Sequence, residues 1–195
     1  MAYISQETKK SLSPAIKAVL KKYGMKGTIG VRHHSTLIVN IKSGDLDILG
    51  AYKRSALSSN KRDMYNPYDV EQLNHVLKTQ SIDVNTYWIS ESFDCPTVTQ
   101  FLEELKTAME GPGFFNNDDS MTDYFHRSHY VDINIGGYDK PYLLTKGEPQ
   151  TFEPVEVIIH PDAKVKAKTP AVETPKAKTA KIYQFPEVTA DTVFH

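Results

Sequence analysis

The feature that most limits what this chain can fold into is a change of composition at Pro161. From there to Lys181 the sequence PDAKVKAKTPAVETPKAKTAK has no aromatic residue and only scattered valines as large apolar side chains. Such a segment buries too little apolar surface to offset the entropy of ordering it, and its prolines favour an extended chain. We therefore expect a globular domain over residues 1–160, a flexible linker rich in Lys, Pro and Ala over 161–181, and a short apolar peptide over 182–195.

The C-terminal peptide regains large apolar side chains. Its candidate docking residues are Ile182, Tyr183, Phe185 and Phe194. The peptide can fold back on its own domain, clamp a neighbouring subunit and so form a homo-oligomer, or add a strand to the sheet of a partner. The sequence leaves these three possibilities open.

The composition favours a cytosolic protein with one well-packed domain, for which 195 residues are sufficient. No apolar run approaches the roughly 20 residues of a membrane-spanning helix, so we expect no membrane partner. The N-terminal MAYISQETKK lacks the apolar core of a signal peptide. The single cysteine, Cys95, excludes an intramolecular disulfide and an all-cysteine metal cluster, and the sequence indicates neither a cofactor nor a metal site.

The first half of the domain has the pattern of a helix followed by a β-hairpin. Ser13 is a good N-cap, Pro14 suits the first helical position, and the apolar spacing predicts a helix over residues 14–23. Alternating apolar residues then predict two strands, over 28–32 and 36–42, joined by a short turn.

The second half is less regular. The polar residues 53–66 predict a mobile loop, and apolar residues between 70 and 77 predict a short amphipathic helix. A stronger apolar stripe predicts a helix over 96–110. We expect a second hairpin within residues 124–144 and a last strand near 155–159.

Two short segments of similar sequence support a repeated helix–hairpin unit. Val39-Asn40-Ile41 matches Ile133-Asn134-Ile135 at an offset of about 94 residues, and a helix is predicted upstream of each segment. We therefore expect an α+β fold, with an antiparallel sheet of four to five strands, two or three helices packed on one face, and a flexible C-terminal tail.

Several segments resemble a family of small, uncharacterised proteins encoded by tailed bacteriophages. These segments are MAYISQETKK, PAIKAVLKKYG, STLIVNIKSG, MTDYF and YVDINIGGYDKPY. The resemblance covers about residues 1–145 and leaves out the tail. It implies a phage accessory protein that acts in the infected bacterium, but it brings no activity and no catalytic residues with it.

The net charge of −1 is unevenly distributed along the chain. Residues 1–62 carry 12 Lys and Arg against 3 Asp and Glu, whereas residues 63–160 carry 5 against 17. Basic side chains with interleaved tyrosines suit phosphate contact and base stacking, so they predict a surface for nucleic acid or an acidic partner. The two segments can also neutralise each other across the fold. The candidate binding residues are Arg32, Lys42, Lys53, Arg54, Lys61, Arg62 and Tyr65.

Two histidine motifs suggest one enzymatic alternative, a phosphodiesterase acting on nucleotides. His34-Ser35-Thr36 is similar to the His-x-Thr/Ser motif of two-histidine phosphoesterases, and His126-Arg127-Ser128 offers a second copy. In that chemistry one histidine acts as base and the other as acid, while the hydroxyls hold the phosphate. The two motifs are 92 residues apart, however, and so fall out of step with the repeat. The catalytic residues of this alternative are His34, Thr36, His126 and Ser128.

Three features decide the functional expectation: no coherent catalytic set, a polarised charge, and a tethered apolar peptide. We expect a non-enzymatic phage protein that binds a host protein or nucleic acid in the cytoplasm of the host bacterium, in host takeover or counter-defence. Besides the phosphodiesterase, the other alternative is a virion or assembly component whose tail clamps a neighbouring subunit.

Overall fold

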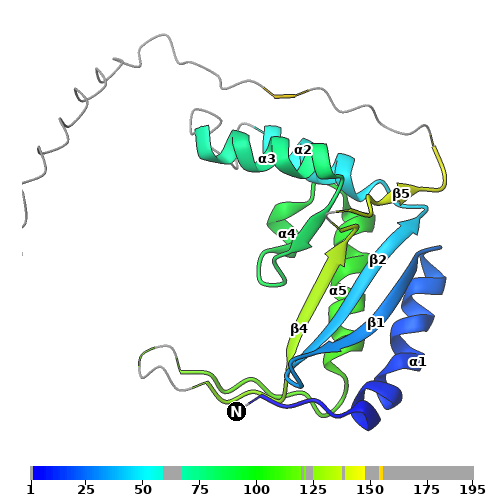
Figure 1. Ribbon diagram of the computed structural model, residues 1–195, viewed down its shortest axis with the longest axis vertical. Helices are drawn as coiled ribbons and strands as arrows, with labels where there is room; N and C mark the ends of the chain where they lie inside the picture. The colour runs from blue at the N-terminus through cyan, green and yellow to red at the C-terminus, as the bar shows by residue number, and fades with distance from the viewer. Residues whose placement is uncertain are drawn as a thin grey trace, which may run out of the picture. The chain divides into compact units, whose positions relative to one another are not determined.

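Among the described residues, five strands form one mixed sheet around the long strand β2 (Thr36–Gly44) (Figure 1). β1 (Lys26–Arg32) pairs antiparallel with β2 on one side, and β4 (Tyr130–Ile135) pairs parallel with it on the other. β3 (Ile82–Val84) pairs antiparallel with β4, and β5 (Leu143–Leu144) pairs parallel with the end of β2. The strand order is therefore β1–β2–β4–β3, with β5 beside the end of β2.

This computed structural model describes most of the expected domain, and the described residues all belong to one compact unit. They are residues 2–58, 67–119 (with the backbone alone at 67–69), 121, 125–137, 139–147 and 154–155. The predictions that fall outside them are the linker, the C-terminal peptide with Ile182, Tyr183, Phe185 and Phe194, the strand residues beyond 155, and the binding candidates Lys61, Arg62 and Tyr65.

Five helices accompany the sheet in the described part of the chain. They are α1 (Gln6–Lys22), α2 (Ile48–Leu57), α3 (Pro67–Thr79), α4 (Ile89–Ser92) and α5 (Pro96–Glu110). α1 and α5 contact each other and lie against one face of the sheet, whereas α2 and α3 pack together beyond the end of β2 (Figure 1).

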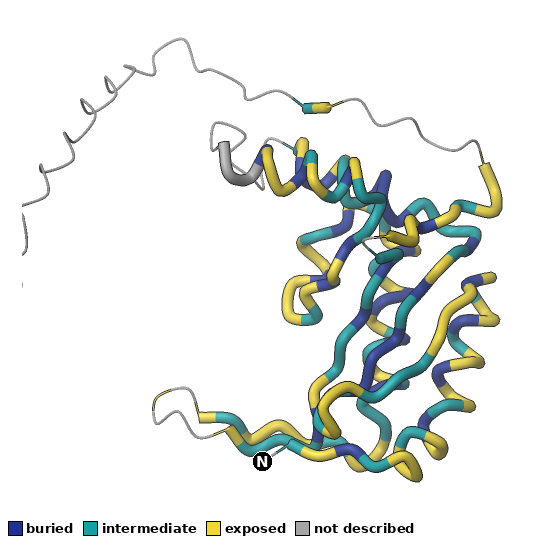
Figure 2. The backbone as a smooth tube through the Cα atoms, viewed as in Figure 1, coloured by how far each residue is buried: buried dark blue, intermediate teal, exposed yellow. Residues whose placement is uncertain are grey.

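The alternation of residues along β2 explains which face of the sheet is buried. Leu37, Val39 and Ile41 are completely buried beneath α1 and α5, and so are their neighbours in β4, Ile133 and Ile135. Figure 2 shows this burial along the two central strands. Apolar side chains from the inner faces of both helices complete the main core, which explains why the periodic segments of the sequence form these elements.

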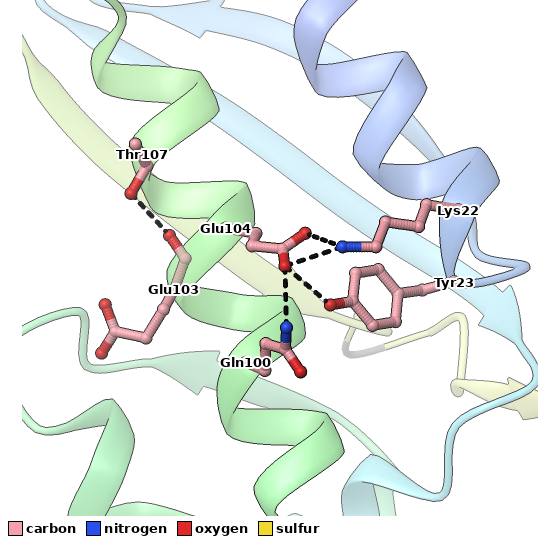
Figure 3. Close-up of polar contacts among 6 residues, drawn as sticks. All are labelled: Lys22, Tyr23, Gln100, Glu103, Glu104 and Thr107. Atoms are coloured by element: carbon pink, nitrogen blue, oxygen red, sulfur yellow. Dashed lines mark hydrogen bonds and ion pairs between the residues drawn. The ribbon is translucent and has the colours of Figure 1, made fainter.

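A polar network joins α1 to α5 at the edge of this core (Figure 3). Lys22 Nζ donates to both carboxylate oxygens of Glu104, at 2.8 and 2.7 Å. Tyr23 Oη donates to Glu104 Oε1 at 3.0 Å, and the Gln100 amide donates to the same oxygen at 3.1 Å. The hydrogen bond from Lys22 lowers the pKa of Glu104, and the same bond raises the pKa of Lys22.

α1 begins earlier than the sequence pattern predicted. Its N-cap is Ser5, whose hydroxyl accepts a hydrogen bond from a backbone N–H of the first turn at 3.0 Å. Pro14 lies inside the helix, and the Ser13 hydroxyl donates to the Lys9 carbonyl at 2.6 Å instead of capping a helix. The predicted start was wrong because burial of Leu12 on the core face keeps the preceding turns helical.

The loop predicted over residues 53–66 is wrong in its first part, because Lys53 and Arg54 lie on α2. The carboxylate of Asp47 caps this helix by accepting a hydrogen bond from the Gly50 N–H at 2.9 Å. Apolar residues in the first turn of α2 are buried, and this tertiary packing outweighs the polar residues that follow. Residues 59–66 lie outside the described residues.

The α+β class, the four-to-five-stranded sheet and the packing of helices on one face are confirmed. The expectation that all strands are antiparallel is wrong, since β2 and β4 run parallel. The second hairpin is also wrong, because β5 pairs with β2 rather than with β4. A parallel pair needs a long crossover connection, and here the chain between β2 and β4 supplies it with α2 to α5.

The two similar segments lie side by side in the sheet. Val39 is opposite Ile133, and Asn40 is opposite Asn134, so the pairing register equals the offset of 94 residues. The similarity therefore marks two neighbouring parallel strands that face the same helices, not two copies of a hairpin.

Candidate partner-binding surface

The described residues between 112 and 128, which are 112–119, 121 and 125–128, belong to an arm that leaves the end of α5 and returns to β4 (Figure 1). Its two limbs are joined through the backbone. The Asn117 N–H donates to the His126 carbonyl at 2.8 Å, and the Ser128 N–H donates to the Phe115 carbonyl at 3.0 Å. The paired limbs extend away from the sheet (Figure 1), and Phe115 and Phe125 on them are exposed.

The sequence explains where the arm begins. Gly111 has a φ of 70°, a left-handed conformation that glycine adopts at little cost, and Pro112 cannot continue a helix. A Cβ atom at Gly111 would also collide with the side chain of Leu12 on α1. The backbone of the turn out of α5 therefore requires glycine, and a larger residue would also have to displace the end of the Leu12 side chain.

His129 holds the root of the arm, where the arm meets the end of α5 and the start of β4. Its side chain is 3% exposed, and Nε2 lies 3.1 Å from the Met109 carbonyl near the end of α5. Because a carbonyl only accepts, Nε2 carries the proton in this contact. The ring of Phe114 stands edge-on to the imidazole, with 5.3 Å between the ring centroids. On the other side, the Tyr3 N–H donates to the Ser128 carbonyl at 2.8 Å, so the N-terminal segment is also bound to the root.

Arg127 connects the arm to its surroundings. Its Nε donates to Asp118 Oδ2 at 2.7 Å and its Nη2 to Tyr87 Oη at 3.2 Å, while the guanidinium lies 4.6 Å from the ring centroid of Tyr130. The side chains of Arg127 and Asp118 are only 14% and 13% exposed. The hydrogen bond from Arg127 holds the pKa of the Asp118 carboxyl below its usual range. The positive charge of Arg127 is therefore paired with the carboxylate of Asp118 within the protein.

Exposed apolar side chains gather on and around the arm. In the described part of the chain nine large hydrophobic residues are exposed, and seven of them lie on the arm or on the segments that meet its root. We call these seven the arm surface: Tyr3, Tyr87, Trp88, Phe115, Met121, Phe125 and Tyr130. The other two, Leu57 and Leu143, lie on α2 and β5.

The surface around the arm root is hollowed on two sides. One cavity of about 510 Å³ has Tyr3, Leu12 and Phe115 among its lining residues, and a smaller one of about 170 Å³ includes Tyr87 and Tyr130. Members of the arm surface thus line both hollows. Projecting aromatic side chains beside concave relief are typical of interfaces, in which buried aromatic anchors fill pockets of a partner.

The described candidates for nucleic-acid binding are spread over different elements. Arg32 and Lys42 lie on β1 and β2, whereas Lys53 and Arg54 lie on α2. Arg32 reaches across β2 to Asp132 of β4, with 2.6 Å between Nη2 and Oδ2. This contact pairs a basic residue from the basic segment 1–62 with an acidic residue from the acidic segment 63–160, as the ion pair between Lys22 and Glu104 does.

Arg54 is also paired, at 3.6 Å from Asp47. Next to the Arg32 ion pair lies a second carboxylate, that of Asp83 on β3. Partial burial raises the pKa of Asp83, and the negative charge of Asp132 raises it further. Arg32 and Arg54 therefore each face a carboxylate, which reduces the positive charge available to phosphates.

The two histidine motifs come to the same end of the sheet. His34 lies in the turn between β1 and β2 with a φ of 55°, and Thr36 begins β2. The His34 carbonyl accepts from the Ile4 N–H at 2.8 Å, next to the bond between Tyr3 and Ser128. In the β2–β4 register, however, Thr36 is opposite Tyr130 and not opposite Ser128. The second motif is thus shifted by two residues from the position that strand pairing would require for it to match the first.

A third hollow of about 600 Å³ opens beside α3 and β3 and has a volume typical of small-ligand sites. The titratable residues in its lining include Glu71, His75 and Asp83. In the described part of the chain, no group of three or more His, Cys, Asp or Glu side chains is arranged to hold a metal ion. Cys95 directly precedes α5, and its side chain makes no capping hydrogen bond.

The sequence patterns did not identify the arm surface, because exposed aromatic residues break no periodicity that predicts secondary structure. A signal was nevertheless present. Tyr87-Trp88 follows the turn-forming Asn85-Thr86, and Phe114-Phe115 follows a Gly-Pro-Gly segment. Aromatic pairs in polar turn segments have no helix or strand to place them in a core, and this favours a binding role.

No family model matches this chain, and neither a curated protein nor a solved structure matches it. None of the described helices is long and apolar enough to cross a membrane.

Proposed function

We propose that this protein is a non-enzymatic binding module that docks on another protein through the arm surface. The observation that supports this proposal is that seven of the nine exposed large hydrophobic residues of the described chain lie on the arm or on the segments that meet its root. Aromatic residues and methionine are enriched at interfaces, and the aromatic residues bury much apolar area at a low cost in side-chain entropy. Exposed to water they favour aggregation, so their concentration indicates a surface that a partner covers.

A protein partner fits the arm surface better than a nucleic acid does. Aromatic stacking on bases needs lysine or arginine side chains that follow the phosphates. The segment 112–131 contains three aspartates and Arg127 as its one basic Lys or Arg, a net charge of −2. Arg127 is itself paired with Asp118. We therefore infer a protein partner with an apolar centre and a basic rim, which complements this charge.

We further propose that the partner is a host protein and that binding takes place in the cytoplasm of a bacterium infected by a tailed phage. The sequence resemblance over residues 1–145 supports this setting. The C-terminal peptide with Ile182, Tyr183, Phe185 and Phe194 is proposed as a second, tethered contact. If instead it clamps a neighbouring subunit of a virion, a chain ending at His160 will be monomeric where the full chain is oligomeric on size-exclusion chromatography.

Affinity capture with matched variants tests the role of the arm surface. The test variant is Tyr87→Ser/Trp88→Ser/Phe125→Ser, and the control is Leu57→Ser/Leu143→Ser, which removes the exposed hydrophobic residues found elsewhere. Far-UV circular dichroism first establishes that both variants are folded. We expect the wild type and the control to capture the same protein from infected cells and the test variant to lose it.

Equal capture by the test variant and the control would refute the proposed surface. If the captured species is nucleic acid, its affinity will fall steeply with salt, and the proposal of a protein partner is then wrong.

A further inference from the structure

The side chain of Asn74 on α3 holds a distant piece of the chain. Its Nδ2–H donates to the Val155 carbonyl at 2.7 Å, and the Val155 N–H donates to Asn74 Oδ1 at 2.7 Å. The two residues are 81 positions apart in the sequence. A side-chain amide offers one donor and one acceptor group, so it satisfies both backbone groups of one extended residue, as a neighbouring β-strand does.

The side chain of Val155 adds an apolar contact. It packs against a small hydrophobic cluster between α2 and α3 that is separate from the main core. The buried members of this cluster are Ala56, Val70, Leu73 and Leu77. Figure 2 shows residues 154–155 as a short coloured piece of tube near these helices. Because the cluster is so small, one further apolar side chain covers a substantial part of it.

The residue before Val155 favours binding in an extended form. Pro154 has a φ fixed near −65°, which restricts the free chain and lowers the entropy lost when it is held in place. Pro154 is exposed whereas Val155 is half-buried, so the segment places one side chain on the cluster and one in solvent. Backbone bonds together with a single apolar pocket resemble the way extended peptides are bound by added strands.

We propose that the face formed by α2 and α3 is a docking site for an extended apolar peptide, and that this chain occupies it in cis with the segment around Val155. Asn74 binds the peptide backbone, and the α2–α3 cluster selects an apolar side chain. The contact fixes the point on the domain from which the last 40 residues of the chain continue. This site is separate from the arm surface, and the inference does not depend on the proposed function.

A peptide supplied in trans tests the site in the full-length chain. Val155→Asp places a carboxylate against the apolar cluster and releases the cis segment. The probe is a labelled peptide, QTFEPVEVIIH, with the sequence of residues 150–160. We expect fluorescence anisotropy to show binding to the Val155→Asp chain, and binding at least about tenfold weaker to the wild type, whose site is already filled.

Asn74→Leu keeps the branching of the side chain but replaces its amide group with methyl groups, and so removes both hydrogen bonds. Added to Val155→Asp, it should weaken peptide binding by at least about tenfold, since each bond contributes several-fold. His75→Leu changes an exposed neighbour on the same helix and should leave peptide binding unchanged. The proposal is overturned if the peptide fails to bind the Val155→Asp chain, or if Asn74→Leu leaves its affinity unchanged.

Hydrogen exchange supplies a second measurement that does not require the released chain to keep its fold. In the wild type the Val155 amide should exchange at least about tenfold more slowly than in the otherwise native Asn74→Leu variant. Equal exchange rates at Val155 in the two proteins would contradict the docking of this segment.

Discussion

Replacing His129 with leucine should loosen the root of the arm and destabilise the domain. His129 is almost fully buried, and its Nε2–H is the donor to the Met109 carbonyl, which lies near the end of α5 where carbonyls have lost their intrahelical partners. Leucine fills most of the space but donates nothing. The carbonyl is then left buried without its hydrogen bond.

The expected magnitude follows from two contacts. A buried carbonyl that loses its donor costs about 1–3 kcal/mol. The edge-on contact between the imidazole and Phe114 adds about 0.5–1.5 kcal/mol. We therefore expect His129→Leu to lower the free energy of unfolding by about 1.5–4.5 kcal/mol, a large share of the 5–15 kcal/mol that is typical of a domain.

Urea unfolding followed by far-UV circular dichroism measures this change, provided that the dependence on urea keeps the same slope. His75→Leu is the matched control, since His75 is exposed on α3, and its effect should stay within about 0.5 kcal/mol. His129→Gln keeps an N–H donor and should recover part of the loss. If His129→Leu changes the unfolding free energy no more than the control does, His129 does not hold the arm.

Three further substitutions have effects that follow from single contacts. Tyr142→Phe removes the hydrogen bond from Tyr142 Oη to the Leu46 carbonyl (2.8 Å) and should lower the free energy of unfolding in urea by about 1–3 kcal/mol. Gly111→Ala, at a φ of 70°, should lower the thermal midpoint by several degrees, and an unchanged midpoint would contradict the requirement for glycine. Because the folded-state pKa of Asp83 is raised by burial and by Asp132, ionisation of Asp83 disfavours folding as pH rises above about 4. Asp83→Asn should therefore raise the unfolding free energy at pH 7 and leave it unchanged near pH 3, and a gain confined to low pH would reverse this reasoning.

Local patterns in the sequence predicted the elements that depend on local contacts. The β1–β2 hairpin needs only alternating apolar residues and a short turn, and α5 has both a clear apolar stripe and a Gly-Pro stop. α2 was missed because its stability comes from burial of its first turn, which no local pattern of polar residues indicates.

The partner of β2 could not be predicted from neighbouring residues. β4 lies about 94 residues further along the chain and runs parallel, so its pairing depends on the packing of the helices between the two strands. The offset of 94 residues between Val39-Asn40-Ile41 and Ile133-Asn134-Ile135 equals the pairing register of β2 and β4. A repeated hairpin would give the same offset, so the sequence does not distinguish the two.

The candidate site was harder to predict than the fold. Charge and interleaved tyrosines predict binding by the basic residues, but the ion pair between Arg32 and Asp132 depends on strands that are distant in the sequence. Exposure of Phe125 and Met121 is likewise a property of the arm as a whole, since no local sequence pattern shows whether an apolar loop residue is exposed. The acidic composition of residues 112–131, by contrast, was available from the sequence.

Site-specific photo-crosslinking tests the central claim, that the arm surface binds a protein, most directly. A photoreactive phenylalanine analogue replaces Phe125, which is 54% exposed on the arm, or Leu143, which is 60% exposed on β5. After irradiation of infected cells, we predict one discrete protein adduct from position 125 and none from position 143. The absence of an adduct at 125, or the same adduct from both positions, would contradict the account.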